Sequence, residues 1–118
     1  YRLPNGKLHR LDGPAYIDGD TKEYWVNDKR HRLDGPAVIK GDYKVYYVNG
    51  LLHRLDGPAF INGDVKAYYV DNKRHRLDGP AYINGDYKEY WVNGKQVTDM
   101  TTPLGALLLL NQMSRENS

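Results

Sequence analysis

The chain has 118 residues, of which 40% are hydrophobic and 27% are charged, a balance that suits one soluble domain. Its 17 basic and 15 acidic residues leave a formal charge of +2, which argues against a strongly electrostatic partner such as bulk nucleic acid or an anionic membrane. There is no cysteine, so disulfides and thiolate metal sites are excluded, and a reducing, cytoplasmic location is expected. The longest apolar run, residues 104–110, is too short for a transmembrane segment. The chain starts with Tyr1 rather than Met, which is consistent with a missing N-terminus.

An internal repeat of 22 residues dominates the sequence. The heptapeptide His-Arg-Leu-Asp-Gly-Pro-Ala begins at His9, His31, His53 and His75. The period divides the chain into units 5–26, 27–48, 49–70 and 71–92, with a partial fifth unit at 93–97. A fixed period of this kind is typical of proteins that stack equivalent structural units, each of which contacts its neighbours.

Each unit has the pattern of two short strands joined by a turn. In the second unit the first strand is Pro36 to Ile39, the turn is Gly41-Asp42, and the second strand is Lys44 to Val48. Glycine and aspartate tolerate the positive φ that a tight hairpin turn requires. The sequence therefore predicts an all-β repeat fold, an antiparallel meander in which four 22-residue hairpin units form one elongated, twisted sheet.

Strand side chains alternate between the two faces of a sheet, which separates invariant from variable positions. Ala37 and Ile39 share one face, as do Tyr46 and Val48, and these positions do not vary among the units. This face is predicted to be the packing surface. The other face varies and is predicted to be a semi-exposed aromatic surface that binds a partner, with the candidate residues Trp25, Tyr47, Tyr69 and Trp91.

The tail at 98–118 breaks the repeat. Thr102 suits the N-cap of a short helix at about 102–113, with Pro103 at its first helical position. Leu104, Leu107, Leu108 and Met113 would form an apolar stripe on this helix. We expect a capping helix that covers the last hairpin or one face of the sheet; the alternative is a helix that docks a partner or a second copy of the chain.

The letters of the heptapeptide have different explanations. Gly13 precedes Pro14, and glycine accepts the extended conformations to which proline restricts its neighbour. Leu11 is predicted to fill the end of the hairpin core, and Asp12 to accept backbone N–H groups. Histidine and arginine are explained least well by folding. The arginines are predicted to bridge to aspartates of adjacent units, or to bind a partner, and form a second candidate set, Arg10, Arg32, Arg54 and Arg76.

The sequence argues against catalysis and metal binding. The four histidines occupy equivalent positions about 10 Å apart, too far to share a zinc ion, which needs its nitrogens at about 2.0–2.1 Å. Serine occurs only as Ser114 and Ser118, in the tail, so a nucleophilic triad is not expected. The carboxylates repeat one environment rather than two different ones. We therefore predict no enzyme activity, no catalytic residue, no metal site and no cofactor.

The stretch from Tyr24 to Ala37, "YWVNDKRHRLDGPA", resembles the MORN repeat, whose Trp, Asn, Lys, His and Gly positions match here at Trp25, Asn27, Lys29, His31 and Gly35. Arginine replaces the glycine that usually follows the histidine. This variant is similar to repeats in proteins of bacteriophages and large DNA viruses. The resemblance covers about residues 5–95. It implies an elongated sheet of hairpins that acts as a scaffold or dimerisation module.

Three hypotheses of function follow. The first is a non-enzymatic protein-binding scaffold or inhibitor; the viral resemblance implies a phage protein that acts on a host protein, such as a defence protein, in the host cytoplasm. The partner is then another protein, or a second copy in a homodimer. The second is a nucleotide or nucleic-acid binder that uses the His-Arg row. The third is a structural component of a virion or assembly.

Overall fold

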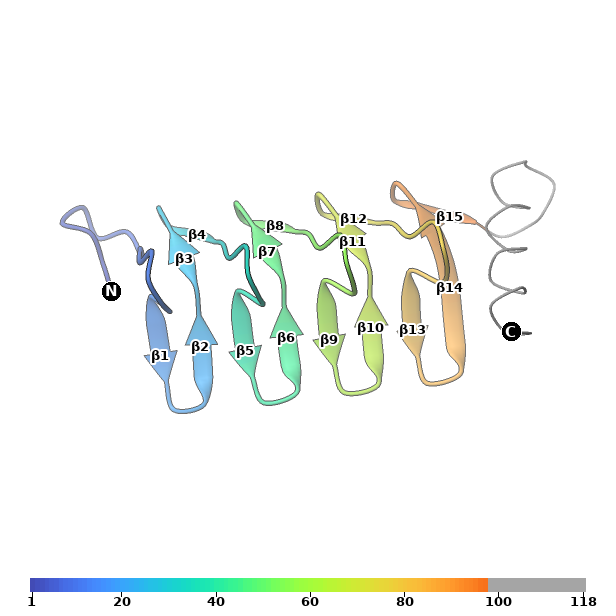
Figure 1. Ribbon diagram of the computed structural model, residues 1–118, viewed down its shortest axis with the longest axis horizontal. Coiled ribbons are helices and arrows are strands. Elements are labelled where there is room, and N and C mark those ends of the chain that lie inside the picture. The colour runs from blue at the N-terminus through green and yellow to red at the C-terminus, as the bar shows by residue number, and fades with distance from the viewer. Residues whose placement is uncertain (98–118) are drawn as a thin grey trace.

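The computed structural model describes residues 1–97, and within this range the chain forms strands and turns but no helix. Its largest element is a nine-stranded antiparallel sheet whose strands follow one another in chain order (Figure 1). The strands are β1 (Tyr16–Asp18), β2 (Thr21–Glu23), β5 (Val38–Lys40), β6 (Tyr43–Val45), β9 (Phe60–Asn62), β10 (Val65–Ala67), β13 (Tyr82–Asn84), β14 (Tyr87–Val92) and β15 (Lys95–Val97). The predicted meander of repeated hairpins in an elongated sheet is confirmed. The predicted helix at 102–113 lies outside the described residues.

The Gly-Asp dipeptides form the turns of these hairpins, as predicted. Asp18 pairs with Thr21 across the first turn, so the loop contains only Gly19 and Asp20. The φ of Gly19 is 60°, whereas that of Asp20 is not positive. A two-residue loop with glycine in the left-handed region at its first position is a type II′ turn, which matches the twist of the flanking strands.

Where each unit meets the next, the chain forms a second hairpin that was not predicted from the sequence. At the first three junctions it pairs β3 (Trp25–Val26) with β4 (Lys29–Arg30), β7 (Tyr47–Val48) with β8 (Leu51–Leu52), and β11 (Tyr69–Val70) with β12 (Lys73–Arg74). Both loop residues have positive φ, 49° at Asn27 and 67° at Asp28, as a type I′ turn requires. The aromatic-Val pair predicted to end the first hairpin therefore begins the second one. Only β14 runs straight through both hairpins.

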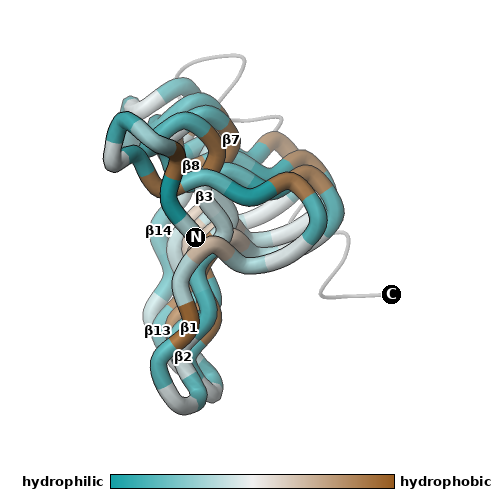
Figure 2. The backbone as a smooth tube through the Cα atoms, turned by 90° about the vertical axis from the view of Figure 1, so that its left-hand side faces the viewer, coloured by the Kyte–Doolittle hydropathy of each residue, from teal (hydrophilic) through white to brown (hydrophobic). Residues whose placement is uncertain are grey.

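The two sets of hairpins stack along the molecule as separate arms. Viewed end-on, the hairpins of the large sheet, including β1 with β2, form one arm, and the type I′ hairpins, including β7 with β8, form another (Figure 2). Hydrogen bonds join consecutive type I′ hairpins, because Gly50 N donates to Arg30 O at 2.8 Å and Gly94 N donates to Arg74 O at 2.8 Å. The repeats are thus joined through backbone groups in both arms.

The core is thin and consists of small side chains. The alanine of each heptapeptide is at most 3% exposed, and the other buried hydrophobic residues of the range 1–97 are Val38, Val45 and Ala67. These three lie on the face predicted to be semi-exposed, whereas Ile17, on the predicted packing face, is 57% exposed. The prediction was wrong in this respect because side chains of the second hairpins cover the variable face. Arg74 of β12, for example, lies with its Cζ 4.8 Å from the ring centroid of Tyr82 in β13.

Candidate binding surfaces

The arginine of each heptapeptide is held by contacts inside the protein. Arg54 Nε donates to Asp56 Oδ1 at 3.0 Å, and its Nη1 donates to the carbonyl oxygen of Pro58 at 3.1 Å. Its Cζ lies 4.0 Å from the ring centroid of Tyr46, which belongs to the preceding unit. The same contacts recur at the other three arginines, with Tyr1, Tyr24 and Tyr68 as the stacked rings, for Arg10, Arg32 and Arg76.

The glycine of the heptapeptide makes room for this arginine. A Cβ atom at Gly57 would lie 2.8 Å from Arg54 Cζ, and one at Gly35 would lie 2.9 Å from Arg32 Cζ. The guanidinium group is therefore enclosed between a tyrosine ring and the glycine backbone. This explains the glycine by close approach, in addition to the conformational restriction that the following proline imposes.

The ion pair between arginine and aspartate forms within a unit, and the prediction that it bridges adjacent units was wrong. Arg32 pairs with Asp34 two residues later, at 2.9 Å. The arginine side chain is 23% exposed and that of the aspartate is 86% exposed, so the positive group lies inside and the negative group outside. The hydrogen bond from the arginine, and then its charge, lower the pKa of Asp12, Asp34 and Asp56.

These lowered pKa values predict a loss of stability in acid. A carboxyl group whose pKa is lower in the folded than in the unfolded protein stabilises the fold above its unfolded pKa, about 4, and this contribution disappears as the pH falls through its folded pKa. We expect the denaturant midpoint of the wild type to fall below about pH 4, by a small amount because the three carboxylates are exposed. The triple variant D12N/D34N/D56N should be less stable at pH 6 and fall less steeply. Parallel pH profiles for the two proteins would contradict this expectation.

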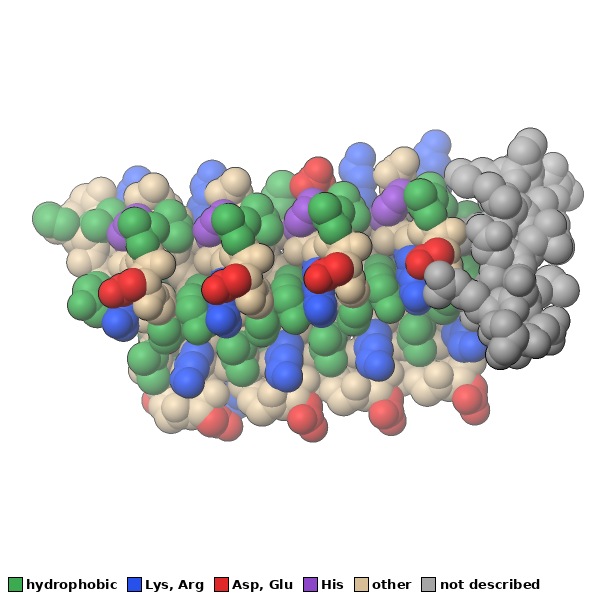
Figure 3. Space-filling model, in the orientation of Figure 1, with side chains coloured by type: hydrophobic (Ala, Val, Ile, Leu, Met, Phe, Trp, Pro, Cys, Tyr) green, Lys and Arg blue, Asp and Glu red, His purple; other side chains and the backbone are tan. Residues whose placement is uncertain are grey.

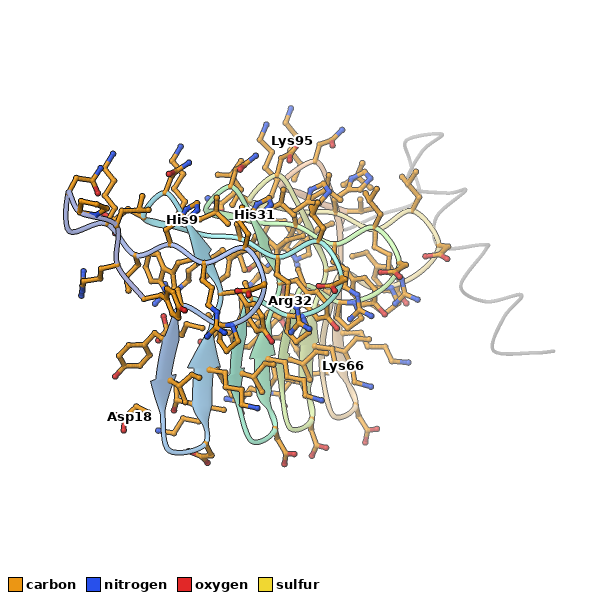
Figure 4. The ribbon with its side chains drawn as sticks, turned by 60° about the vertical axis from the view of Figure 1, so that its left-hand side comes forward. His9, Asp18, His31, Arg32, Lys66 and Lys95 are labelled. Carbon is orange, nitrogen blue, oxygen red and sulfur yellow. The ribbon has the colours of Figure 1, made fainter. Side chains whose placement is uncertain are left out.

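The histidine of each heptapeptide joins consecutive units. Asn49 N donates to His31 Nδ1 at 3.0 Å, and Asp71 N donates to His53 Nδ1 at 3.2 Å. The donor in each case belongs to the type I′ turn of the next unit, 18 residues along the chain. His9 and His31 are labelled in Figure 4, one unit apart.

The leucine of the heptapeptide is the letter that the fold does not use. The predicted burial of Leu11 at the end of the hairpin is wrong, because this residue is 80% exposed, and Leu33 and Leu55 are each 79% exposed. Leu77 is 54% exposed. The sequence explains histidine and arginine least well, but in the structure both make contacts within the protein. The residue of the heptapeptide that folding leaves unexplained, and that a ligand could contact, is the leucine.

The four predicted aromatic residues lie in one row on the other side of the protein from the arginines of the heptapeptides. Trp25 directly follows Tyr24, so in an extended segment the two side chains point in opposite directions. Arg30, in β4, links two members of the row, because its Cζ is 5.0 Å from the ring centroid of Trp25 and 5.7 Å from that of Tyr47. Arg74, in β12, is likewise 5.9 Å from Tyr69 and 5.2 Å from Trp91.

This row continues onto the large sheet. The rings of Tyr43 and Phe60 meet edge to face at 5.6 Å, and those of Tyr82 and Tyr87 meet at 6.1 Å. We call the whole surface the aromatic face and define it by Tyr16, Trp25, Arg30, Tyr43, Tyr47, Phe60, Tyr69, Arg74, Tyr82, Tyr87 and Trp91. All of these residues are half-buried or exposed.

Two glutamates hold the ends of the aromatic face in place. Trp25 Nε1 donates to Glu23 Oε1 at 3.0 Å, and Trp91 Nε1 donates to Glu89 Oε1 at 2.9 Å. Hydrogen bonds from Tyr87 and Trp91 lower the pKa of Glu89. Arg30 and Arg74 were not predicted as members of this surface. The sequence did contain a signal for both arginines. Each follows an aromatic residue by five positions, with a two-residue turn between them, so in a hairpin the two residues pair directly, as Trp25 does with Arg30 and Tyr69 with Arg74.

Within residues 1–97, no group of three or more His, Asp or Glu side chains is placed to hold a metal ion. In the same range, no helix long and apolar enough to cross a membrane is found. Comparison of the chain with protein-family models, curated proteins and solved structures finds no match in any of the three.

Proposed function

We propose that this protein is a non-enzymatic binding scaffold that captures another protein through its aromatic face. The observation that carries the proposal is the row of aromatic side chains along the repeats, in which Arg30 joins the first two members and Arg74 the last two. Trp, Tyr and Arg are the residues enriched at the energetic centres of protein interfaces.

The geometry of the row favours binding over a purely structural role. The indole N–H groups already have glutamate partners, and Arg30 and Arg74 already contact carboxylates at 3.4 Å and 3.3 Å. The face is therefore organised before a partner arrives, so little side-chain entropy is lost on binding. The repeat supplies the same kind of contact several times along one line, which suits an extended protein surface.

The resemblance to MORN-like repeats of bacteriophage and large-DNA-virus proteins supports one form of this proposal, in which a viral protein acts on a host protein in the cytoplasm or pairs with a second copy of itself. The alternative of a nucleotide or nucleic-acid binder through the His-Arg row stays a prediction. Its four arginine side chains are only 19–28% exposed, because each is stacked on a ring, so little positive charge faces solvent for a phosphate to contact. A role as a virion component also stays a prediction.

The double variant Trp25→Ala, Trp91→Ala tests the proposed function. It removes two rings from the ends of the aromatic face, so we expect it to keep a folded circular-dichroism spectrum and to lose capture of the partner. The measurement is affinity capture from host lysate followed by mass spectrometry of the retained proteins.

The matched control is Leu33→Ser, Leu55→Ser, which changes two exposed residues on the heptapeptide loops and should retain the same protein. If the wild type retains nothing specific, or if both double variants retain the partner equally, the aromatic face is not the binding surface.

A further inference from the structure

The exposed leucines form the walls of three equivalent grooves. Each groove lies between two consecutive heptapeptide loops and has a leucine from each as its two walls, with volumes of about 630, 460 and 510 Å³ along the chain. The middle groove is also lined by Tyr46 and Val48, whose neighbour Tyr47 belongs to the aromatic face, and by Arg32, Arg54 and His53. The grooves therefore open on a different side of the protein from the aromatic face.

The carboxylates are the most exposed charged groups of the groove lining. The aspartate that follows each leucine projects into solvent, with Asp34 86% and Asp56 87% exposed, whereas the arginines to which they bond are each 23% exposed. Figure 3 shows the aspartates in a line beside exposed hydrophobic side chains, with basic side chains below them. A ligand that approaches the ridge meets apolar walls first and carboxylates beside them, which favours a basic side chain with a long aliphatic stem.

The spacing of the grooves selects the conformation of an extended ligand. Neighbouring grooves are two strands apart, roughly 9.6 Å. Three residues of a polyproline II helix advance about 9.3 Å and bring the side chain back to the same face. Three residues of a β-strand advance about 10 Å but point the side chain to the opposite face. Seven residues of an α-helix advance about 10.5 Å and turn the side chain away by about 20° at each groove.

We propose that the leucine ridge binds a polyproline II peptide segment with a basic residue at every third position. Each basic side chain lies in one groove, with its aliphatic stem between two leucines, for example Leu33 and Leu55, and its charged group at the aspartate of the rim. Three consecutive grooves read three such residues. This surface and its ligand are independent of the aromatic face and of the partner proposed for it.

The probe is a fluorescein-labelled peptide of four Lys-Pro-Pro units, and the measurement is fluorescence anisotropy with the full chain. The matched control peptide has the same composition in the order Lys-Lys-Pro-Pro-Pro-Pro, written twice, so its charge and length are equal and its three-residue period is lost. We expect the periodic peptide to bind at least tenfold more tightly than this control. A peptide of four Glu-Pro-Pro units should not bind.

Variants of the protein locate the site. Leu33→Ser, Leu55→Ser should weaken binding of the periodic peptide at least fivefold with an unchanged thermal unfolding midpoint, because both side chains are exposed. Trp25→Ala, Trp91→Ala should bind this peptide as the wild type does, even where it has lost the protein partner. Equal affinity for the two lysine peptides, absence of binding of both, or an unchanged affinity in the leucine variant would each overturn the proposal.

Discussion

Replacing Arg54 with alanine is expected to lower the free energy of unfolding by about 2–3 kcal/mol, the sum of a charge-assisted hydrogen bond to a backbone carbonyl and a cation–π contact. The side chain bonds to the Pro58 carbonyl oxygen at 3.1 Å and stacks 4.0 Å from the Tyr46 centroid. Its ion pair with Asp56 adds little, because that carboxylate is 87% exposed. The measurement is chemical denaturation at neutral pH, followed by tryptophan fluorescence.

Lys44→Ala is the matched control. Lys44 is an exposed basic residue on the large sheet, so its removal changes the net charge by the same amount and should alter stability by less than about 0.5 kcal/mol. Arg54→Lys should recover only part of the loss, because an ammonium group cannot stack flat on a ring and bond to two acceptors in the same geometry. A loss for Arg54→Ala no larger than that for Lys44→Ala would show that the arginine is not structural.

The fold was predictable where its determinants are local. The 22-residue period and the Gly-Asp turns are enough to predict a meander of hairpins, because a glycine at the first loop position selects the turn type by itself. The second hairpins were missed although Asn49-Gly50 and Asn93-Gly94 are strong type I′ signals. Two features of the sequence hid these hairpins. One of the equivalent turns is Asn27-Asp28, which is a weaker turn signal, and the aromatic-Val pair before each turn continues the alternating pattern of the preceding strand.

The candidate sites were predictable only in part, because repetition alone does not separate residues that contact the next unit from residues that contact a ligand. The ring on which Arg54 stacks lies eight residues earlier, in another unit, and the donor to His53 lies 18 residues later. Neither partner is implied by the heptapeptide itself. Leu55 shows the opposite error. An apolar residue that recurs in every unit is ordinarily expected in the core, but Leu55 is 79% exposed. Strand alternation predicted the aromatic row, but it did not show that Val38, Val45 and Ala67, on the same predicted face, are buried.

Gly57→Ala is expected to destabilise the protein by about 2 kcal/mol, within the range for forcing an extra methyl group into a filled space. The new Cβ would lie 2.8 Å from Arg54 Cζ, so the guanidinium would have to shift, which would disturb its stacking on the Tyr46 ring and its hydrogen bond to the Pro58 carbonyl oxygen. The φ of Gly57 is not positive, so the backbone itself is accessible to alanine. The measurement is the same denaturation experiment, together with near-ultraviolet circular dichroism, which reports the tyrosine environment.

The double variant distinguishes this mechanism from a backbone requirement before Pro58. In the Arg54→Ala background the space beside Gly57 is empty, so Gly57→Ala should cost nothing and should even stabilise by up to about 1 kcal/mol, because alanine restricts the unfolded chain. The two changes are then coupled by about 2 kcal/mol, as expected for residues in direct contact. Gly63→Ala is the control, because Gly63 has a φ of 57° and a Cβ at this position would have no atom within 4 Å, so its cost should be equal in both backgrounds. If Gly57→Ala lowers the free energy of unfolding equally with and without Arg54, the glycine is required by the backbone conformation before Pro58. The stacked arginine would then not explain why glycine recurs at this position of every heptapeptide.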